Sequence, residues 1–580
     1  MPPDAQQLEP APGEILVRMY RHGLGDCYLI VVGRRAGEAF RLLIDCGVHR
    51  RQRDGSARLA EVQQDLVAAS GGHLDAVVLT HEHADHLSGV TQRGSVFLDD
   101  SLTVDELWLA WTERPGDPLA DRLRKRQQAD RAVLDAAVSR LREREAASAV
   151  DPALGPEHRS RLRRAEGRQD FSEPSGDLHD EAQWAAVLDA LPTDYRTPLE
   201  ASREGGTLGI TGKRRRSIPW NQAALAVLRD KAATTRYHAP GDVIEPADVD
   251  GCRLYVLGPP RDERLLKKDA PSRRRGAPTG VYRETYLAGG DSPLGASAGL
   301  GLGEEMTEHL ERSPFADLDV IAVPLTALDA RTSGSGTDRS IDAARLGQAA
   351  RGVATRYRAP DARWRAIDDD WLDESDALAL AMDGDTNNTS LVLAIELGEP
   401  GEGDVLLFPG DAQVGNWLSW RDRDYVCGEV RQTADALLGR TRLYKVAHHG
   451  SHNGTLRADA RAVADGEPYG LELMNNIVAM INVDREAVER PMPHVWHMPH
   501  RPLYDALRLK AARRVLRSDD SGAPLGRHAD PDITPDTDTW APVPGMARAS
   551  WRRAPTVFEA GMPSAHYFDV RFTFPAKERP

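Results

Sequence analysis

Four side chains that can bind a metal ion lie within six consecutive residues: His81, His83, Asp85 and His86. Imidazole nitrogens and carboxylate oxygens are the ligands that zinc, manganese and iron take in proteins. His81 and His83 are two residues apart, so in an extended backbone both side chains point the same way. Asp85 and His86 follow directly and need a turn to reach the same point. This H-x-H-x-D-H pattern predicts a metal centre, and a solvated histidine-rich loop is the alternative reading.

The elements that must position these side chains are short apolar runs. Residues 74–79, which directly precede the pattern, form the run LDAVVL and predict a short buried strand. Further strands are expected where apolar residues run together or alternate with polar ones. These expected strands are residues 14–20, 28–32, 40–44, 104–111, 252–258, 391–397, 405–408, 443–447 and 567–574. Residues 59–69 and 503–516 have helical spacing.

Several of these motifs together resemble one known family. The H-x-H-x-D-H pattern resembles the metal signature of the metallo-β-lactamase superfamily. Residues 23–30 and 42–47 resemble its two opening strands, and LLFPGD at 406–411 resembles its later aspartate motif. KVAHHGS at 445–451 resembles the closing histidine motif of the ComEC-type branch, the hydrolase domains attached to bacterial DNA-uptake channels. The resemblance implies an α/β fold, the four-layer αββα sandwich of that superfamily.

The resemblance also implies a set of site residues. It implies two divalent cations, with Zn²⁺ expected and Mn²⁺ as the alternative. Their ligands would be His81, His83, Asp85, His86, Asp411 and His448. Asp411 would touch both cations, and Asp45 and Asn388 would support the ligands without touching the ions. Asp85 and His449 are the candidate catalytic residues.

Two points of the ligand set stay open in the sequence. Either His448 or His449 can be the closing ligand, and His448 is preferred because it is the first residue after the expected strand. His449 would then face the substrate, where it could stabilise charge or protonate a leaving group. Many superfamily members carry a third histidine in the turn that residues 385–390 occupy here, but this turn, DTNNTS, has none. The ComEC-type branch has an Asn-Ser turn in the same place.

The motifs divide the chain into parts of different character. Residues 1–114 are expected to form the first part of the core, and residues 115–250, which carry no superfamily motif, a largely helical insertion. The second part of the core is expected over 251–490, with a flexible excursion near 261–345 where Gly, Ser, Arg and Asp are frequent. Residues 491–580 are expected to form a C-terminal extension that ends in a core strand.

Composition limits what kind of protein this is. A net charge of −15 argues against a general nucleic-acid coat protein, although it allows a basic groove on an acidic body. The four cysteines lack CxxC spacing and suggest neither a zinc ribbon nor a disulfide framework. No apolar run approaches the roughly 20 residues of a membrane span, and the first residues lack the apolar stretch of a signal peptide. A cytoplasmic protein without membrane association is therefore expected.

The chemistry expected from these residues is hydrolysis by a metal-activated water, with no need for a nucleophilic Ser or Cys. The ComEC-type resemblance favours a phosphodiesterase or nuclease with a nucleic-acid or nucleotide substrate. One alternative is a hydrolase of a small ester, lactam or thioester. A catalytically silent scaffold is disfavoured by the complete motif. A further alternative is an effector or accessory component of a bacterial defence system, with protein partners encoded in the same operon. This role is compatible with nuclease chemistry.

Overall fold

The computed structural model describes the parts of the chain that build two large β-sheets and the helices around them. The described residues are 7–130, 220–269, 279–280, 382–458, 468–489, 496–511, 514–519, 549–553, 557–559, 562–564 and 567–574. The chain divides into two compact units, and every element named below belongs to the larger one, residues 1–127, 166–287 and 380–580.

The first sheet has eight strands in the order β18-β21-β1-β2-β3-β4-β5-β6. Neighbouring strands are antiparallel from β18 to β3 and parallel from β3 to β6. The strands are β1 (Glu14–Tyr20), β2 (Cys27–Val32), β3 (Phe40–Cys46), β4 (His73–Val78), β5 (Thr103–Ala110), β6 (Ala232–His238), β18 (Ala549–Arg553) and β21 (Tyr567–Thr573).

The second sheet has seven strands in the order β17-β16-β14-β11-β10-β8-β7. It repeats the mixture of the first sheet, because β7, β8, β10 and β11 are antiparallel neighbours and β11, β14, β16 and β17 are parallel ones. The strands are β7 (Val243–Ile244), β8 (Cys252–Gly258), β10 (Val392–Leu397), β11 (Asp404–Phe408), β14 (Thr441–Lys445), β16 (Val478–Ile481) and β17 (Val515–Arg517).

Strand β2 shows why the sheets become the inner layers of a sandwich. All of its side chains are buried, and they alternate between two cores as the two-residue period of a strand requires. Tyr28, Ile30 and Val32 pack with residues of the second sheet. Cys27, Leu29 and Val31 pack against the helices outside the first sheet. A strand that is buried on both faces therefore has a continuous run of apolar residues in its sequence.

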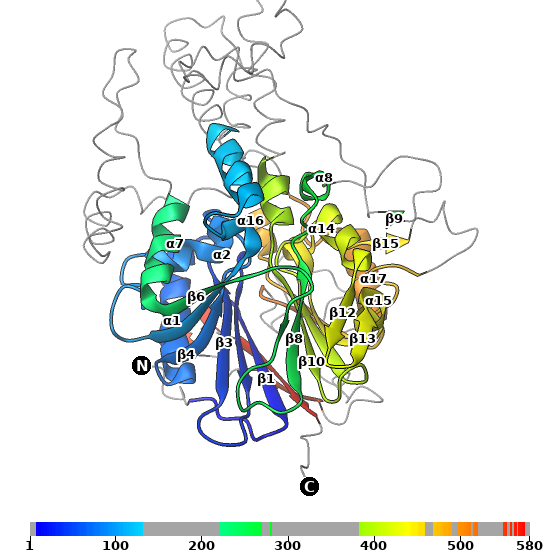
Figure 1. Ribbon diagram of the computed structural model, residues 1–580. Coiled ribbons are helices and arrows are strands. Elements are labelled where there is room, and N and C mark those ends of the chain that lie inside the picture. Colours follow the sequence, from blue (N-terminus) through cyan, green and yellow to red (C-terminus); the bar gives the residue numbers. More distant parts are fainter. Residues whose placement is uncertain are drawn as a thin grey trace, which may run out of the picture. The chain divides into compact units, whose positions relative to one another are not determined.

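Helices cover the outer face of each sheet, which completes an αββα sandwich (Figure 1). On the first sheet these are α1 (Gly55–Ser70), α2 (Ala84–Thr91) and α7 (Trp220–Lys231). On the second sheet they are α14 (Val414–Ser419), α15 (Ala434–Gly439), α16 (Arg485–Val488) and α17 (Arg501–Lys510). Smaller elements are α8 (Glu263–Leu266), η1 (Trp111–Glu113), η5 (Trp420–Asp422), η6 (Ala447–Gly450), β9 (Thr279–Gly280), β12 (Asp424–Cys427), β13 (Val430–Thr433), β15 (Arg457–Ala458), β19 (Val557–Glu559) and β20 (Met562–Ser564).

The expected αββα fold is confirmed, but the core includes more of the chain than the sequence suggested. Strands β6 and β7 and helix α7 lie within 115–250, the range expected to be an insertion, and β6 is the edge strand of the first sheet. The helix expected over 503–516 ends at Lys510, and β17 follows at the edge of the second sheet. Residues 131–219, 270–278 and 281–345, which belong to the expected insertion and excursion, lie outside the described residues.

The last strand of the chain is held beside the first by a buried ion pair. Arg18 of β1 donates from Nε and Nη2 to the two carboxylate oxygens of Asp569 in β21, both at 2.8 Å. Arg18 Nη1 also donates to Asp65 of α1 at 2.8 Å. This two-pronged arginine–carboxylate geometry fixes the antiparallel register of β1 and β21, in which Arg18 lies opposite Asp569.

Among the described residues, the structure contains no helix with the length and apolar character of a membrane span.

Candidate metal centre

The candidate site lies where several parallel strands end. Strand β4 leads into the loop that carries His81 to His86, and β11 leads to Asp411. Strand β3 ends at Cys46 beside Asp45, and β14 leads to the turn with His448 and His449. Because the carboxyl ends of parallel strands in a sheet meet at one edge, residues distant in the sequence converge there.

The loop after β4 turns sharply because helix α2 begins at Ala84, directly after His83. Asp85 and His86 lie in the first turn of this helix, and both are fully buried. The loop passes close over Gly47, where a Cβ atom would come within 2.4 Å of the backbone of Asp85 and His86. Glycine at position 47 therefore permits the close approach of the two loops.

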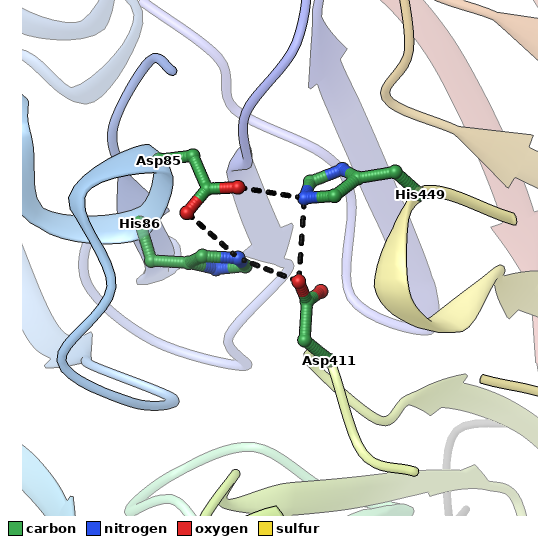
Figure 2. Close-up of side chains that lie close together, drawn as sticks. All are labelled: Asp85, His86, Asp411 and His449. Carbon is green, nitrogen blue, oxygen red and sulfur yellow. Dashed lines mark hydrogen bonds and ion pairs between the residues drawn. The ribbon is translucent and has the colours of Figure 1, made fainter. Parts of the chain in front are cut away.

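Four of the buried side chains form a closed cluster, shown in Figure 2. His449 Nε2 lies 2.9 Å from Asp85 Oδ2 and 3.3 Å from Asp411 Oδ2. His86 Nε2 lies 3.2 Å from Asp411 Oδ2 and 3.9 Å from Asp85 Oδ1. Two imidazole nitrogens and two carboxylates thus face one point, which is the ligand chemistry of a zinc or manganese ion.

The donor atoms of this cluster are suited to a cation. Asp85 Oδ1, His86 Nε2 and Asp411 Oδ2 are buried and make no hydrogen bond with any described residue. A buried polar atom without a hydrogen bond costs free energy, so such atoms in a native structure call for a partner. A divalent cation among them would satisfy all three atoms at once, and we conclude that these residues fit a metal ion.

The electrostatics of the cluster also favour positive charge. Burial alone would lower the pKa of His449, but Asp411 and Asp85 raise it to about 10. Burial opposes the charged form of His86 as well, but Asp411, Asp45 and Asp85 raise its pKa well above the ordinary value. The carboxylates that keep the His86 and His449 imidazoles protonated also attract metal cations. A metal ion competes with those protons for the same nitrogen lone pairs.

His81 and His83 form a neighbouring pair of donors. His81 Nε2 and His83 Nδ1 lie 3.0 Å apart, and the ring centroids of His81 and His86 are 4.2 Å apart, so the pair adjoins the cluster. Burial lowers the pKa of His83 to about 4 and that of His81 well below its ordinary value, so both rings are neutral. Two neutral imidazole nitrogens at this separation can bind one ion together.

Polar groups lie beside the outward nitrogens of this pair. His81 Nδ1 lies 3.1 Å from Thr80 Oγ1 and 3.4 Å from Ser390 Oγ. His83 Nε2 lies 3.6 Å from Asp383 Oδ1. Carboxylates and hydroxyls in such positions orient a ligating imidazole and select its tautomer. Asp383 was not among the residues expected from the sequence, and no motif points to it.

Asp45 lies where the resemblance implies a supporting carboxylate. It accepts hydrogen bonds from Thr80 N at 2.8 Å and from Thr80 Oγ1 at 2.7 Å. His86 Nδ1 lies 2.8 Å from Asp45 Oδ2, which leaves Nε2 of the same ring facing the cluster. Asp45 has a left-handed backbone (φ 56), a conformation that Asp and Asn adopt more readily than most other residues.

The structure differs from the sequence-based choice between the two closing histidines, because His449 and not His448 lies in the four-residue cluster. Strand β14 already ends at Lys445, and residues 447–450 form a tight turn in which both histidines are left-handed, with φ of 48 and 51. This turn brings the second histidine, rather than the first residue past the expected strand, to Asp85 and Asp411. The ligand role of either histidine remains a prediction.

His448 instead lies between two amide side chains. Gln413 Nε2 is 3.2 Å from His448 Nδ1, and Asn387 Nδ2 is 3.4 Å from His448 Nε2. Burial lowers the pKa of His448, so its ring is neutral. Asn388, expected to support the ligands, accepts from Asn416 N at 3.1 Å and donates to Lys268 O at 3.0 Å, so it secures the turn itself. Asn387, its neighbour, is the residue that faces His448.

Two charged residues near the cluster, Asp26 and Lys445, were missed from the sequence. Both are buried, and the Lys445 ammonium contacts the Asp26 carboxylate and lies 3.1 Å from Asp411 Oδ1. Burial by itself lowers the pKa of Lys445, but Asp26 and Asp411 raise it above its ordinary value, so the side chain stays charged. The available signal was a lysine directly before the KVAHHGS histidines, at the end of the largely buried strand β14, because a buried lysine needs an anionic partner.

Comparison with known proteins finds a matching family model for part of the chain but no individual relative. Residues 20–178 match the family model of the metallo-beta-lactamase superfamily. This part of the chain is therefore similar to the domains of that superfamily, a class of metal-dependent hydrolases. No curated protein and no solved structure gives a significant match.

Proposed function

We propose that this protein is a metal-dependent phosphodiesterase or nuclease that acts on a nucleic acid or a nucleotide. The observation that carries the hydrolase part is the buried cluster of Asp85, His86, Asp411 and His449. Three of its donor atoms, one each on Asp85, His86 and Asp411, make no hydrogen bond with any described residue. The phosphodiester part is supported by the resemblance of KVAHHGS and the Asn-Ser turn to the ComEC-type branch.

The residues divide into groups that would hold cations and groups that would meet the substrate. Asp85, His86 and His449 would hold one ion, His81 and His83 would bind the other, and Asp411 would contact both. Bound divalent cations activate water as a nucleophile and neutralise charge that develops on the attacked group. No separate serine or cysteine nucleophile is needed for this chemistry.

The neutral polar groups beside the cluster suit a substrate with several oxygen atoms. Asn387 and Gln413 present buried amides on either side of the neutral His448 ring. Amide N–H groups can donate to the non-bridging oxygens of a phosphoryl group. Donors fixed in a buried site stabilise charge more than mobile water does, because they need little reorganisation during the reaction.

A substrate panel tests this proposal directly. The purified protein, with its metal content measured by mass spectrometry, is assayed on single-stranded DNA, RNA, cyclic nucleotides and bis-p-nitrophenyl phosphate. A lactam, a simple ester and a thioester form the second arm. We expect phosphodiester hydrolysis that stops on chelation and returns when Zn²⁺ or Mn²⁺ is added back. Hydrolysis confined to the second arm would contradict the phosphodiester assignment, and activity that survives chelation with no metal bound would contradict the metal dependence.

A further inference from the structure

Lys445 is a buried cation directly behind the candidate metal centre. Its side chain is 2% exposed, and it is the last residue of β14, three residues before His448. The ammonium donates to Gly410 O at 2.8 Å and to Asp411 Oδ1 at 3.1 Å, and it contacts Asp26 Oδ2. An ammonium has three N–H donors, and these three oxygens account for all of them.

These contacts give the two oxygens of Asp411 different surroundings. Oδ1 faces the Lys445 ammonium, whereas Oδ2 faces His86 Nε2 at 3.2 Å and His449 Nε2 at 3.3 Å. Oδ2 is also the atom that makes no hydrogen bond with any described residue. A carboxylate without such a cation behind it could bind an ion through both oxygens, but here the first oxygen is already engaged.

We propose that Lys445 is a positioning residue that restricts Asp411 to metal coordination through a single oxygen, Oδ2. Asp26 compensates the charge of Lys445, so the pair fixes the geometry of Asp411 without adding net charge beside the ligands. Catalytic metal sites keep at least one coordination position for water or substrate. Because Lys445 engages Oδ1, this oxygen does not occupy the coordination position that water or substrate needs. The inference rests on the proposed function only in requiring that an ion binds.

The test replaces Lys445 and its partner together. In the double variant Lys445→Met with Asp26→Asn, no buried charge is left unpaired by the removal of the ammonium, which protects the fold. The probe is Co²⁺ bound to the metal-free protein, whose visible absorption weakens as the coordination number rises. We expect the released Oδ1 to join the coordination, so the absorbance per bound Co²⁺ should fall severalfold relative to the unsubstituted protein.

Asp26→Asn alone is the matched control, because it keeps Lys445 and its bond to Asp411. Its Co²⁺ spectrum should stay that of the unsubstituted protein. A double variant with an unchanged spectrum at equal Co²⁺ content would overturn the proposal. A control that changes as much as the double variant would also overturn it, since Asp26 rather than Lys445 would then set the geometry.

A second measurement needs no substrate and uses Asp411→Asn only as its control. X-ray absorption spectra of the unsubstituted Co²⁺ or Zn²⁺ protein report the number of oxygen neighbours and whether a carboxylate binds through one atom or two. We expect no carboxylate bound through two oxygens that is lost in Asp411→Asn. A carboxylate bound through two oxygens in the unsubstituted protein, lost in Asp411→Asn, would refute the inference. A protein that binds metal but cleaves no phosphodiester would refute the proposed function alone.

Discussion

His86 places its two ring nitrogens against two different carboxylates, with Nδ1 2.8 Å from Asp45 Oδ2 and Nε2 3.2 Å from Asp411 Oδ2. The Asp45 carboxylate can only accept, so it selects the tautomer of His86 with the proton on Nδ1 and the lone pair on Nε2. Asp45 therefore prepares His86 as a ligand although it lies behind the ring.

Replacing Asp45 with Asn should weaken metal binding without unfolding the protein. Asparagine tolerates the left-handed backbone at this position and can still accept from Thr80 N. Its amide N–H₂ would face His86 Nδ1 and favour the wrong tautomer. We expect roughly 10- to 100-fold lower metal affinity, the usual cost of losing a group that orients a ligand. Competition titration with a chromophoric chelator measures this affinity, and an unchanged value would show that Asp45 does not set the tautomer.

Replacing Asp411 with Asn separates charge from shape at the centre of the cluster. The variant keeps the size of the side chain but removes the anion that lies between His86 and His449. We expect hydrolysis to fall by roughly 100-fold or more, as when other fixed charge-stabilising groups are removed, while circular dichroism stays unchanged. Assays with added Mn²⁺ or Zn²⁺ alongside metal counts check this. Full activity at unchanged metal content would show that Asp411 does not hold the ions.

The adjacent histidines provide a matched pair of variants. Asparagine at either position accepts the left-handed backbone, so His448→Asn and His449→Asn should both fold. Because His449 and not His448 lies against Asp85 and Asp411, only His449→Asn should lose bound metal. His448→Asn should keep its metal and lose turnover. The metal content of the two variants decides which histidine is the ligand. Loss of metal in His448→Asn but not in His449→Asn would restore His448 as the closing ligand.

Two buried histidines outside the cluster predict a loss of stability in acid. Burial lowers the pKa of His22 to about 4 and that of His49 to about 3, against 6.5 for an exposed histidine. Below pH 6.5 the unfolded chain binds protons that the folded protein excludes, so the free energy of unfolding falls as pH is lowered. Each histidine should contribute a loss of roughly 2 kcal/mol between about pH 7.5 and about pH 5.

His49→Gln tests this pH dependence, since glutamine can replace His49 Nδ1 as the acceptor for Arg51 N but does not titrate. Urea unfolding of the metal-free protein at the two pH values gives the difference in stability. The variant should lose roughly 2 kcal/mol less than the unsubstituted protein as pH falls, the share assigned to one histidine. Equal losses in both proteins would mean that His49 is protonated in the folded state or does not titrate in this range.

Local patterns in the sequence predict most strands of the two sheets but miss others, among them the buried β16. Apolar runs locate β1, β4 and β11 to within a residue or two, because strands buried on both faces carry continuous apolar residues. Strand β6, with the sequence AATTRYH, has mostly polar and partly exposed side chains, as an edge strand allows. Its place in the sheet depends on pairing with β5, which no local pattern reveals.

The same limit applies to the candidate site. The H-x-H-x-D-H run and Asp411 stand out in the sequence because each belongs to a short motif, and the structure brings Asp85, His86 and Asp411 together. The choice of His449 depends on the left-handed turn after β14, and a backbone conformation of this kind has no side-chain signature in two adjacent histidines. Asp383 and Asp26 matter through contacts with residues far along the chain, so only the folded structure identifies them.

The bond between Arg18 and Asp569 has a consequence for the order in which the chain can fold. The two residues are 551 positions apart, and β21 fills the place beside β1 in the first sheet. At roughly 5–20 residues per second, a ribosome takes about half a minute to two minutes to make the intervening chain. Until then one edge of β1 has no partner, and an unpaired strand edge invites aggregation. We therefore expect the nascent protein to depend on chaperones more than its final stability suggests.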